Sequence, residues 1–153
     1  MYQRILVPVD GSPAARRGLS EAIALAKDQG AKLRIVHVVN EWLVVSPDAS
    51  GANLGDVVQQ MLTAGRALLN DADALARRAG VNANTVLLEE MGAQAGACIL
   101  KHAGEWPADL IVCGTHGRRG MRRLLLGSDA EYIVRNATVP VLLLRGSLNN
   151  GDD

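Results

Sequence analysis

The stretch from Gly114 to Asp129 holds the residues of this 153-residue sequence that are best suited to chemistry. It reads GTHGRRGMRRLLLGSD, with four glycines and four arginines, and no acidic residue precedes Asp129. Glycine lets backbone N–H groups approach a ligand closely, and the arginine guanidinium group fits phosphate oxygens. A helix beginning at Gly127 and Ser128 would add its free amides and the positive end of its dipole. The spacing therefore predicts a phosphate cradle.

A carboxylate, Asp10, follows the first apolar run of the chain. In an open parallel sheet, ligands bind beyond the carboxyl ends of the strands, where the strand order reverses. Asp10 is therefore expected at the rim of the same crevice, although aspartate also stabilises turns by accepting local backbone bonds. The general nucleotide motifs are missing, because the chain has neither a G-x-x-x-x-G-K-[ST] loop nor a G-x-G-x-x-G after that run.

The residues of the glycine-rich stretch also have structural interpretations. Ser128 and Glu131 match a capping box, so Ser128 is expected to begin its helix whether or not it also contacts phosphate. The arginines could form a solvated face. Asp129 would repel a triphosphate unless Mg²⁺ lay between them. Alternatively, Asp129 points away and stabilises its own helix by about 0.3–1 kcal/mol from the first turn.

The histidines and cysteines form no catalytic or metal-binding pattern. His37 and His102 fall on predicted core faces, while His116, inside the glycine-rich stretch, has no evident partner for acid–base work. Cys98 and Cys113 have no metal-ligand or disulfide spacing and are expected to be reduced, packed thiols. No G-x-S-x-G elbow is present, so no nucleophile–base pair can be identified.

Composition and charge exclude several classes of protein. Lysine and arginine total 16, as aspartate and glutamate do, so net charge gives no general attraction to nucleic acid. Aromatic residues are only 3% of the chain, which leaves little for base-stacking platforms. No apolar run approaches the roughly 20 residues of a membrane span, and the first is broken by Pro8 and Asp10. A cytoplasmic protein without an export signal is expected.

Five near-continuous apolar runs predict strands buried on both faces of a parallel sheet: Ile5–Val9, Leu33–Val39, Thr85–Leu88, Leu110–Cys113 and Val139–Leu144. Four segments with helical periodicity separate them. The second of these predicts a buried stripe of Val57, Met61, Ala64, Leu68, Ala72, Leu75 and Ala79. The alternation predicts one doubly wound α/β domain with right-handed crossovers over residues 1–146 and a flexible polar tail over 147–153.

Local punctuation agrees with this division of the chain. Ser12 before Pro13 predicts a helix start, as does a capping box of Asp56 with Gln59. Gly30 and Gly80 stand where helices end in a left-handed residue. Residues 46–55 are expected to form a loop.

The glycine spacing resembles the G-x2-G-x9-G-[ST] pattern of the universal stress protein family, with Gly114, Gly117, Gly127 and Ser128 at its positions. The similarity covers nearly the whole chain. Residues 5–12, 35–39, 108–117 and 139–145 resemble, in order, the first, second, fourth and last strands of that family.

This resemblance implies a five-stranded parallel sheet of order 3-2-1-4-5, a homodimer formed through the last strand and, where the glycines are kept, binding of ATP, with or without Mg²⁺. It also implies an adenosine side near the first two strands and phosphates near the fourth helix. The nucleotide-binding residues implied are Pro8, Val9, Asp10, Val38, Val39, Gly114, Thr115, Gly117, Arg118, Gly127, Ser128 and Asp129.

Three functions are compatible with these observations. The first is an ATP-binding regulatory homodimer whose nucleotide state controls a protein partner. The second is a slow Mg²⁺-dependent ATPase or autophosphorylating enzyme that uses Asp10 or Asp129 near the metal. The third is a dimeric interaction module without nucleotide, because a fold does not fix a function.

Overall fold

Five parallel strands form one sheet in the order β3-β2-β1-β4-β5. The computed structural model describes residues 1–40, 53–116 and 126–146. The strands are β1 (Arg4–Pro8), β2 (Lys32–Asn40), β3 (Ala83–Glu90), β4 (Leu110–Gly114) and β5 (Val141–Leu144). The order 3-2-1-4-5 and the predicted strands are confirmed, with ends that differ by up to two residues.

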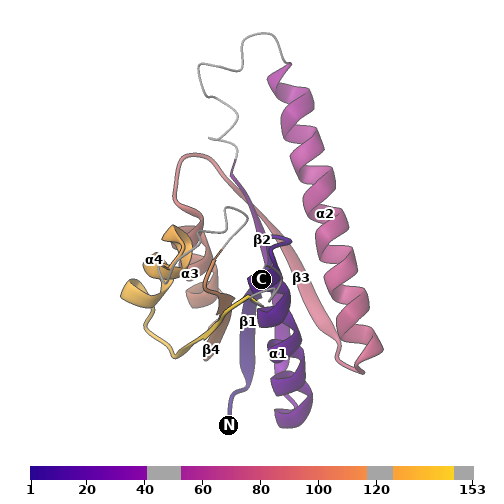
Figure 1. Ribbon diagram of the computed structural model, residues 1–153, viewed down its shortest axis with the longest axis vertical. Coiled ribbons are helices and arrows are strands. Elements are labelled where there is room, and N and C mark those ends of the chain that lie inside the picture. The colour runs from indigo at the N-terminus through magenta and orange to yellow at the C-terminus, as the bar shows by residue number, and fades with distance from the viewer. Residues whose placement is uncertain (41–52, 117–125, 147–153) are drawn as a thin grey trace, which may run out of the picture.

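Helices cover both faces of the sheet (Figure 1). They are α1 (Pro13–Gln29), α2 (Leu54–Arg78), α3 (Ala95–Glu105) and α4 (Ser128–Asn136). Leu19 of α1 and Leu69 of α2 pack in one core with Val7, whereas Ile99 of α3 and Ile133 of α4 pack in a second core on the opposite face. Within the described ranges, no helix is long and apolar enough to cross a membrane.

The ends of α1 match the prediction. The Ser12 hydroxyl accepts a hydrogen bond from the Ala15 amide at 3.2 Å, and Pro13 occupies the first helical turn. Gly30 ends the helix with φ +64°, a conformation that favours glycine. Gly80 likewise has φ +81° just after α2.

The start and the buried stripe of α2 differ from the prediction. The helix begins at Leu54, after Asn53, whose side chain accepts from the Gly55 amide, so the Asp56–Gln59 capping box is wrong and the predicted loop ends earlier. The buried stripe is Leu62, Gly65, Leu69, Ala72 and Ala76. It lies mostly one position later than predicted because Gly65 approaches His37 and Leu87, and a hydropathy pattern gives glycine no weight.

The strand order reverses at β1. This strand pairs with β2 on one side and with β4 on the other. At this point α1 crosses close to the end of β4. A Cβ at Gly114 would lie 2.6 Å from the Ala14 carbonyl carbon and 2.7 Å from the Ala15 nitrogen. Real Cβ atoms do not approach backbone so closely, so the packing of α1 against β4 requires glycine at position 114.

Candidate functional site

The ends of β1 and β4 are joined by a chain of hydrogen bonds across the reversal of strand order. The Asp10 carboxylate accepts from the Ser12 amide at 2.9 Å, around Gly11, whose φ of +83° favours glycine. The Ser12 hydroxyl, besides capping α1, donates to the His116 carbonyl at 3.2 Å. Asp10 thus lies at the carboxyl edge of the sheet, where the sequence predicted it, and the rim has a fixed backbone.

The residues after β4 hold the start of α4 beside the same edge. The Gly127 amide donates to the Thr115 carbonyl at 2.7 Å, and the Thr115 amide donates to Leu144 of β5 at 2.8 Å. A hydrogen bond therefore joins the beginning of the glycine-rich stretch to its end. Thr115 and Gly127, two predicted site residues that are twelve positions apart, become neighbours.

The His116 side chain lies in this region with one nitrogen satisfied. Its Nδ1 is 2.9 Å from the Thr115 hydroxyl, while its Nε2 is buried and has no hydrogen-bond partner in the described part of the chain. A buried polar atom without a partner costs about 1–3 kcal/mol, so such atoms usually mark a place where a ligand or water binds. The sequence indicated only that His116 is near the glycines, and the open nitrogen was not predictable.

The amino end of α4 has no side-chain cap. The N-cap residue is Gly127, with φ −60° and ψ 155°, and it makes no side-chain cap hydrogen bond. The predicted capping box of Ser128 with Glu131 is wrong, because Ser128 is the first helical residue and lies exposed. A serine cannot cap a helix from inside its first turn, so within the described residues the first-turn amides and the positive end of the dipole have no side-chain acceptor.

Asp129 lies in the first turn of α4, but its carboxylate bonds elsewhere. Its Oδ1 accepts from the Gly96 amide in the first turn of α3 at 3.0 Å. The prediction that Asp129 points away from the phosphate position fits this bond. Sequence inspection missed Gln94 and Gly96, which contact the start of α4, because nothing in the local pattern of α3 indicates a neighbour 33 positions away.

The residues predicted for the adenosine side lie at the ends of β1 and β2. Val9 and Val39 are buried, whereas Pro8 and Val38 are half-buried. His37 Nδ1 donates to the Val9 carbonyl at 2.7 Å. His37 is the satisfied core histidine that the sequence predicted. Gly117 and Arg118 lie outside the described residues.

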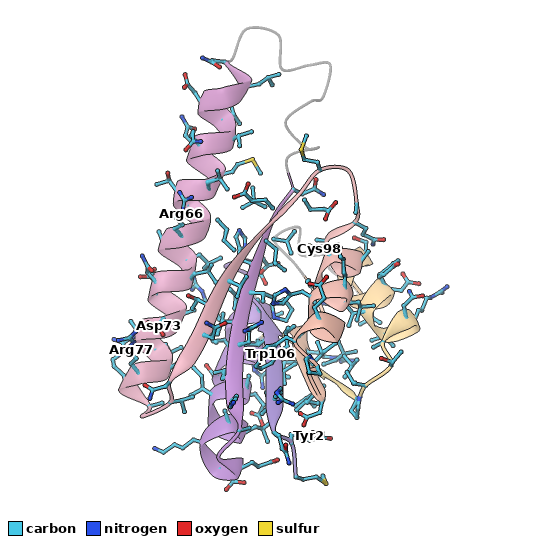
Figure 2. All side chains as sticks on the ribbon, turned by 180° about the vertical axis from the view of Figure 1, so that it is seen from behind. Tyr2, Arg66, Asp73, Arg77, Cys98 and Trp106 are labelled. Atoms are coloured by element: carbon cyan, nitrogen blue, oxygen red, sulfur yellow. The ribbon has the colours of Figure 1, made fainter. Side chains whose placement is uncertain are left out.

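Other reactive groups lie in packed positions. Burial raises the pKa of the Cys113 thiol to about 12, and burial followed by the nearby Glu90 raises that of Cys98, which sits on α3 (Figure 2). Both thiols are free. Across the described residues no three histidine, cysteine or acidic side chains gather as metal ligands.

The fold and this edge define a class, the doubly wound α/β proteins whose ligand crevice lies at the reversal of strand order. Comparison with known proteins identifies the family. The model of the universal stress protein family matches residues 1–145, and the chain belongs to this family. It is 34% identical over 146 residues to universal stress protein MJ0531 of Methanocaldococcus jannaschii, covering 95% of this chain and 83% of that protein.

Solved structures agree with the assignment. A universal stress protein family member from Burkholderia pseudomallei superposes with a TM-score of 0.76 at 34% identity, covering 94% of this chain and 96% of its own. A universal stress protein in complex with cAMP has a TM-score of 0.68 at 28% identity, with 95% and 99% covered. One from Archaeoglobus fulgidus in complex with dAMP has a TM-score of 0.66 at 26% identity, with 94% and 98% covered.

Proposed function

We propose that this protein binds ATP at the carboxyl edge of the sheet and acts in the cytoplasm as a regulatory homodimer, with nucleotide occupancy controlling its contact with a protein partner. The observation that carries the proposal is the uncapped amino end of α4, fixed beside β4 by the Gly127–Thr115 bond. Outward-facing amides at a helix amino end favour an anion, and a phosphate chain supplies one.

Two further observations support a nucleotide rather than a simple anion. The unpartnered Nε2 of His116 lies in the same region and can exchange a hydrogen bond with a ribose hydroxyl or a phosphate oxygen. Family members of known structure carry cAMP and dAMP, both adenine nucleotides. In this arrangement Gly127 and Ser128 hold phosphate, while Pro8, Val9 and the end of β2 face the base.

The dimer is proposed to form through β5. Within the described residues this strand pairs with β4 alone, and its other edge is unpaired. Leu142 on β5 and Val134 on α4 are 37% and 44% exposed, so an apolar surface accompanies that open edge. An unpaired edge of this kind readily pairs with another strand. We expect Leu142→Arg to shift the protein towards monomer in sedimentation, with ATP affinity retained.

The direct test is calorimetric titration of nucleotide-stripped protein with ATP, with and without Mg²⁺, alongside the variant Gly127→Asp. The backbone of Gly127 has an N-cap conformation that aspartate adopts readily. The new carboxylate would accept from the α4 amides and occupy the phosphate position with negative charge. We expect ATP affinity to fall at least about tenfold, equivalent to about 1.4 kcal/mol, with an unchanged or raised melting temperature.

Ser20→Asp provides the matched control, because it adds the same charge at an exposed position of α1. It should bind ATP as the original protein does. Absence of heat with ATP under both metal conditions, together with no adenine nucleotide released from freshly purified protein, would contradict the proposal and favour a nucleotide-free interaction module.

A further inference from the structure

The amino ends of α3 and α4 are joined by two reciprocal hydrogen bonds, which we call the α3–α4 clasp. The Asp129 carboxylate of α4 accepts from the Gly96 amide of α3 at 3.0 Å. In return, the Gln94 side-chain amide before α3 donates to the Ser128 carbonyl at 3.0 Å. Each bond joins a side chain to backbone, so the clasp fixes the two helix ends relative to each other.

The clasp brings the two backbones unusually close. A Cβ at Gly96 would lie 3.0 Å from the Asp129 carbonyl oxygen and 3.1 Å from the Tyr132 Cβ. Both neighbours belong to the first turns of α4, and one is backbone. A side chain at position 96 would therefore push its neighbours in α4 by a few tenths of an ångström and so move the start of that helix.

The clasp also determines which helix the Asp129 carboxylate bonds to. The first turn of α3 has no acidic residue, and its N-cap residue Gln94 makes no side-chain cap bond, so Asp129 provides the missing acceptor from outside. A carboxylate in the first turn of α4 would otherwise be attracted to the amides of its own helix. Its engagement with α3 leaves the α4 amides available.

The turn before α3 is held from the other side as well. Asn40, the last residue of β2, donates from its side-chain amide to the Ala93 carbonyl at 3.2 Å. Ala93 and Gln94 therefore connect the end of β2, proposed to face the base, with the start of α4, proposed to hold phosphate. Figure 1 places this turn between the end of β3 and α3, on the α4 side of the sheet.

We infer that Asp129 is a positioning residue for the phosphate chain: through the α3–α4 clasp it fixes the α4 amides at a set distance from the end of β2. This inference rests on the proposed function and deepens it, since it assigns a role to the acid in the phosphate-binding helix. Asp129 acts on the ligand through Gly96 and α4, and it requires no metal between carboxylate and phosphate.

The test compares adenosine with ATP in Asp129→Ala and Asp129→Asn. Adenosine measures the base side alone, whereas ATP also needs the start of α4. We expect Asp129→Ala to weaken ATP about tenfold and adenosine less than about twofold, because a shift of α4 removes phosphate contacts only. Asp129→Asn keeps an acceptor oxygen for Gly96 and should retain most of the ATP affinity.

Glu131→Ala is the matched control. Glu131 carries the same charge in the same helical turn, but it pairs with Arg135 at 2.9 Å on an exposed surface. It should leave both affinities unchanged. Gln94→Ala removes the other half of the clasp and should weaken ATP in the same direction, which keeps the test open if Asp129→Ala folds poorly.

Hydrogen exchange of the Gly96 amide supplies a readout that does not involve ligand. Its protection should fall in Asp129→Ala and persist in Asp129→Asn. Equal losses of adenosine and ATP affinity, or tighter ATP binding in Asp129→Ala, would overturn the inference, the latter by showing that the carboxylate faces the phosphates. An original protein that binds adenosine and ATP equally well would overturn it too, whereas one that binds neither would overturn the proposed function itself.

Discussion

The two edges of the sheet at which the parallel strands begin and end, the amino and the carboxyl edge, differ in how their polar groups are paired. At the amino edge, polar groups satisfy one another: the Asp109 carboxylate accepts from the Gln3 amide at 2.8 Å and the Arg4 amide at 2.9 Å. At the carboxyl edge, the α4 amides lack a side-chain cap and His116 Nε2 lacks a partner among the described residues. At the amino edge these two backbone amides are satisfied within the chain, whereas at the carboxyl edge the α4 amides and His116 Nε2 are left for a ligand or water.

Arg34 shows that pairing at the amino edge is extensive but not complete, because its buried Nε has no hydrogen-bond partner in the described part of the chain. The Arg34 guanidinium lies over the Trp106 ring, 4.5 Å from its centroid, at the end of α3 (Figure 2). Its Nη1 is 3.2 Å from His102 Nε2. Because arginine can only donate, His102 accepts at Nε2 and is neutral, with its proton on Nδ1. Together with the proposed nucleotide site, this difference assigns stability and binding to opposite ends of the same strands.

Gly114 is the strongest exception to the assignment of stability to the amino edge. It lies at the carboxyl edge, yet it packs closely against the backbone of α1. We expect Gly114→Ala to lower the free energy of unfolding by about 3 kcal/mol or more, since neither Ala14 nor Ala15 backbone can move aside. Urea unfolding measures this. A bulkier Gly114→Val variant should not fold, so loss of ATP binding there would say nothing about the ligand.

Gly18→Ala is the control on the same contact between α1 and β4. Its Cβ would meet the Cys113 carbonyl carbon at 3.5 Å, an ordinary contact. A helical glycine replaced by alanine gains about 0.5–1 kcal/mol, so Gly18→Ala should be neutral or stabilising. Similar losses in both variants would refute the proposed role of the close approach at 114.

Asp109→Ala tests whether the amino edge is structural only. It removes the acceptor for two backbone amides, and hydrogen bonds to charged groups contribute about 1.5–3 kcal/mol. We expect a loss of unfolding free energy in this range with ATP affinity unchanged, measured by urea denaturation and calorimetry. Asp71→Ala, at an exposed position of α2, should change neither quantity. A fall in ATP affinity for Asp109→Ala would show that the edges are coupled.

Ser12→Ala and Ser128→Ala compare the starts of two helices at one edge. Loss of the Ser12 cap should cost about 0.5–2 kcal/mol of stability. Ser128 caps nothing, so Ser128→Ala should change stability by less than about 0.5 kcal/mol while weakening ATP. If thermal unfolding moved equally for both, the description of α4 as uncapped would be wrong.

The smallest effect is expected from pH at the amino edge. Burial, followed by the nearby charge of Arg34, lowers the pKa of His102 below its ordinary value, while Glu105 opposes the shift. The unfolded chain therefore binds this proton first as pH falls. The contribution of neutral His102 to the free energy of unfolding is therefore present in full above about pH 6.5. It decreases as the pH drops towards the folded-state pKa.

His102→Gln keeps an acceptor for Arg34 without a titrating ring. Urea midpoints measured at pH 7.5 and pH 5.5 should differ less in this variant than in the original protein. Identical pH dependence in the two proteins would remove His102 as the source.

The fold followed closely from the sequence because its signals are local. Short unbroken apolar runs such as Leu110–Cys113 are typical of doubly buried strands, and Ser12, Gly30 and Gly80 mark helix ends through their own chemistry. Strand order came from the family resemblance alone. The α2 stripe was wrong where a tertiary contact, Gly65 against His37, outweighed periodicity.

The places of the candidate site residues in the fold could be predicted, but their hydrogen-bond partners could not. Asp10, Thr115 and Gly127 were placed at the right edge because parallel strands share a carboxyl end. The partner of Asp129 could not be predicted, since α3 and α4 meet through tertiary packing. The spacing of Ser128 and Glu131 predicted Ser128 as the N-cap residue of α4. In the structure Gly127 is the N-cap residue, so the helix begins one residue earlier than the spacing predicted.

The position of β1 has a consequence for how the chain reaches this structure. The strand that comes first in the chain lies in the middle of the sheet. Its Arg4 amide donates to Asp109, a residue 105 positions later in the chain. Such distant pairing makes loop closure costly and folding slow compared with helical proteins. A newly synthesised chain can pair β1 with β2 early, but it must keep the other side of β1 unpaired until β4 has been made.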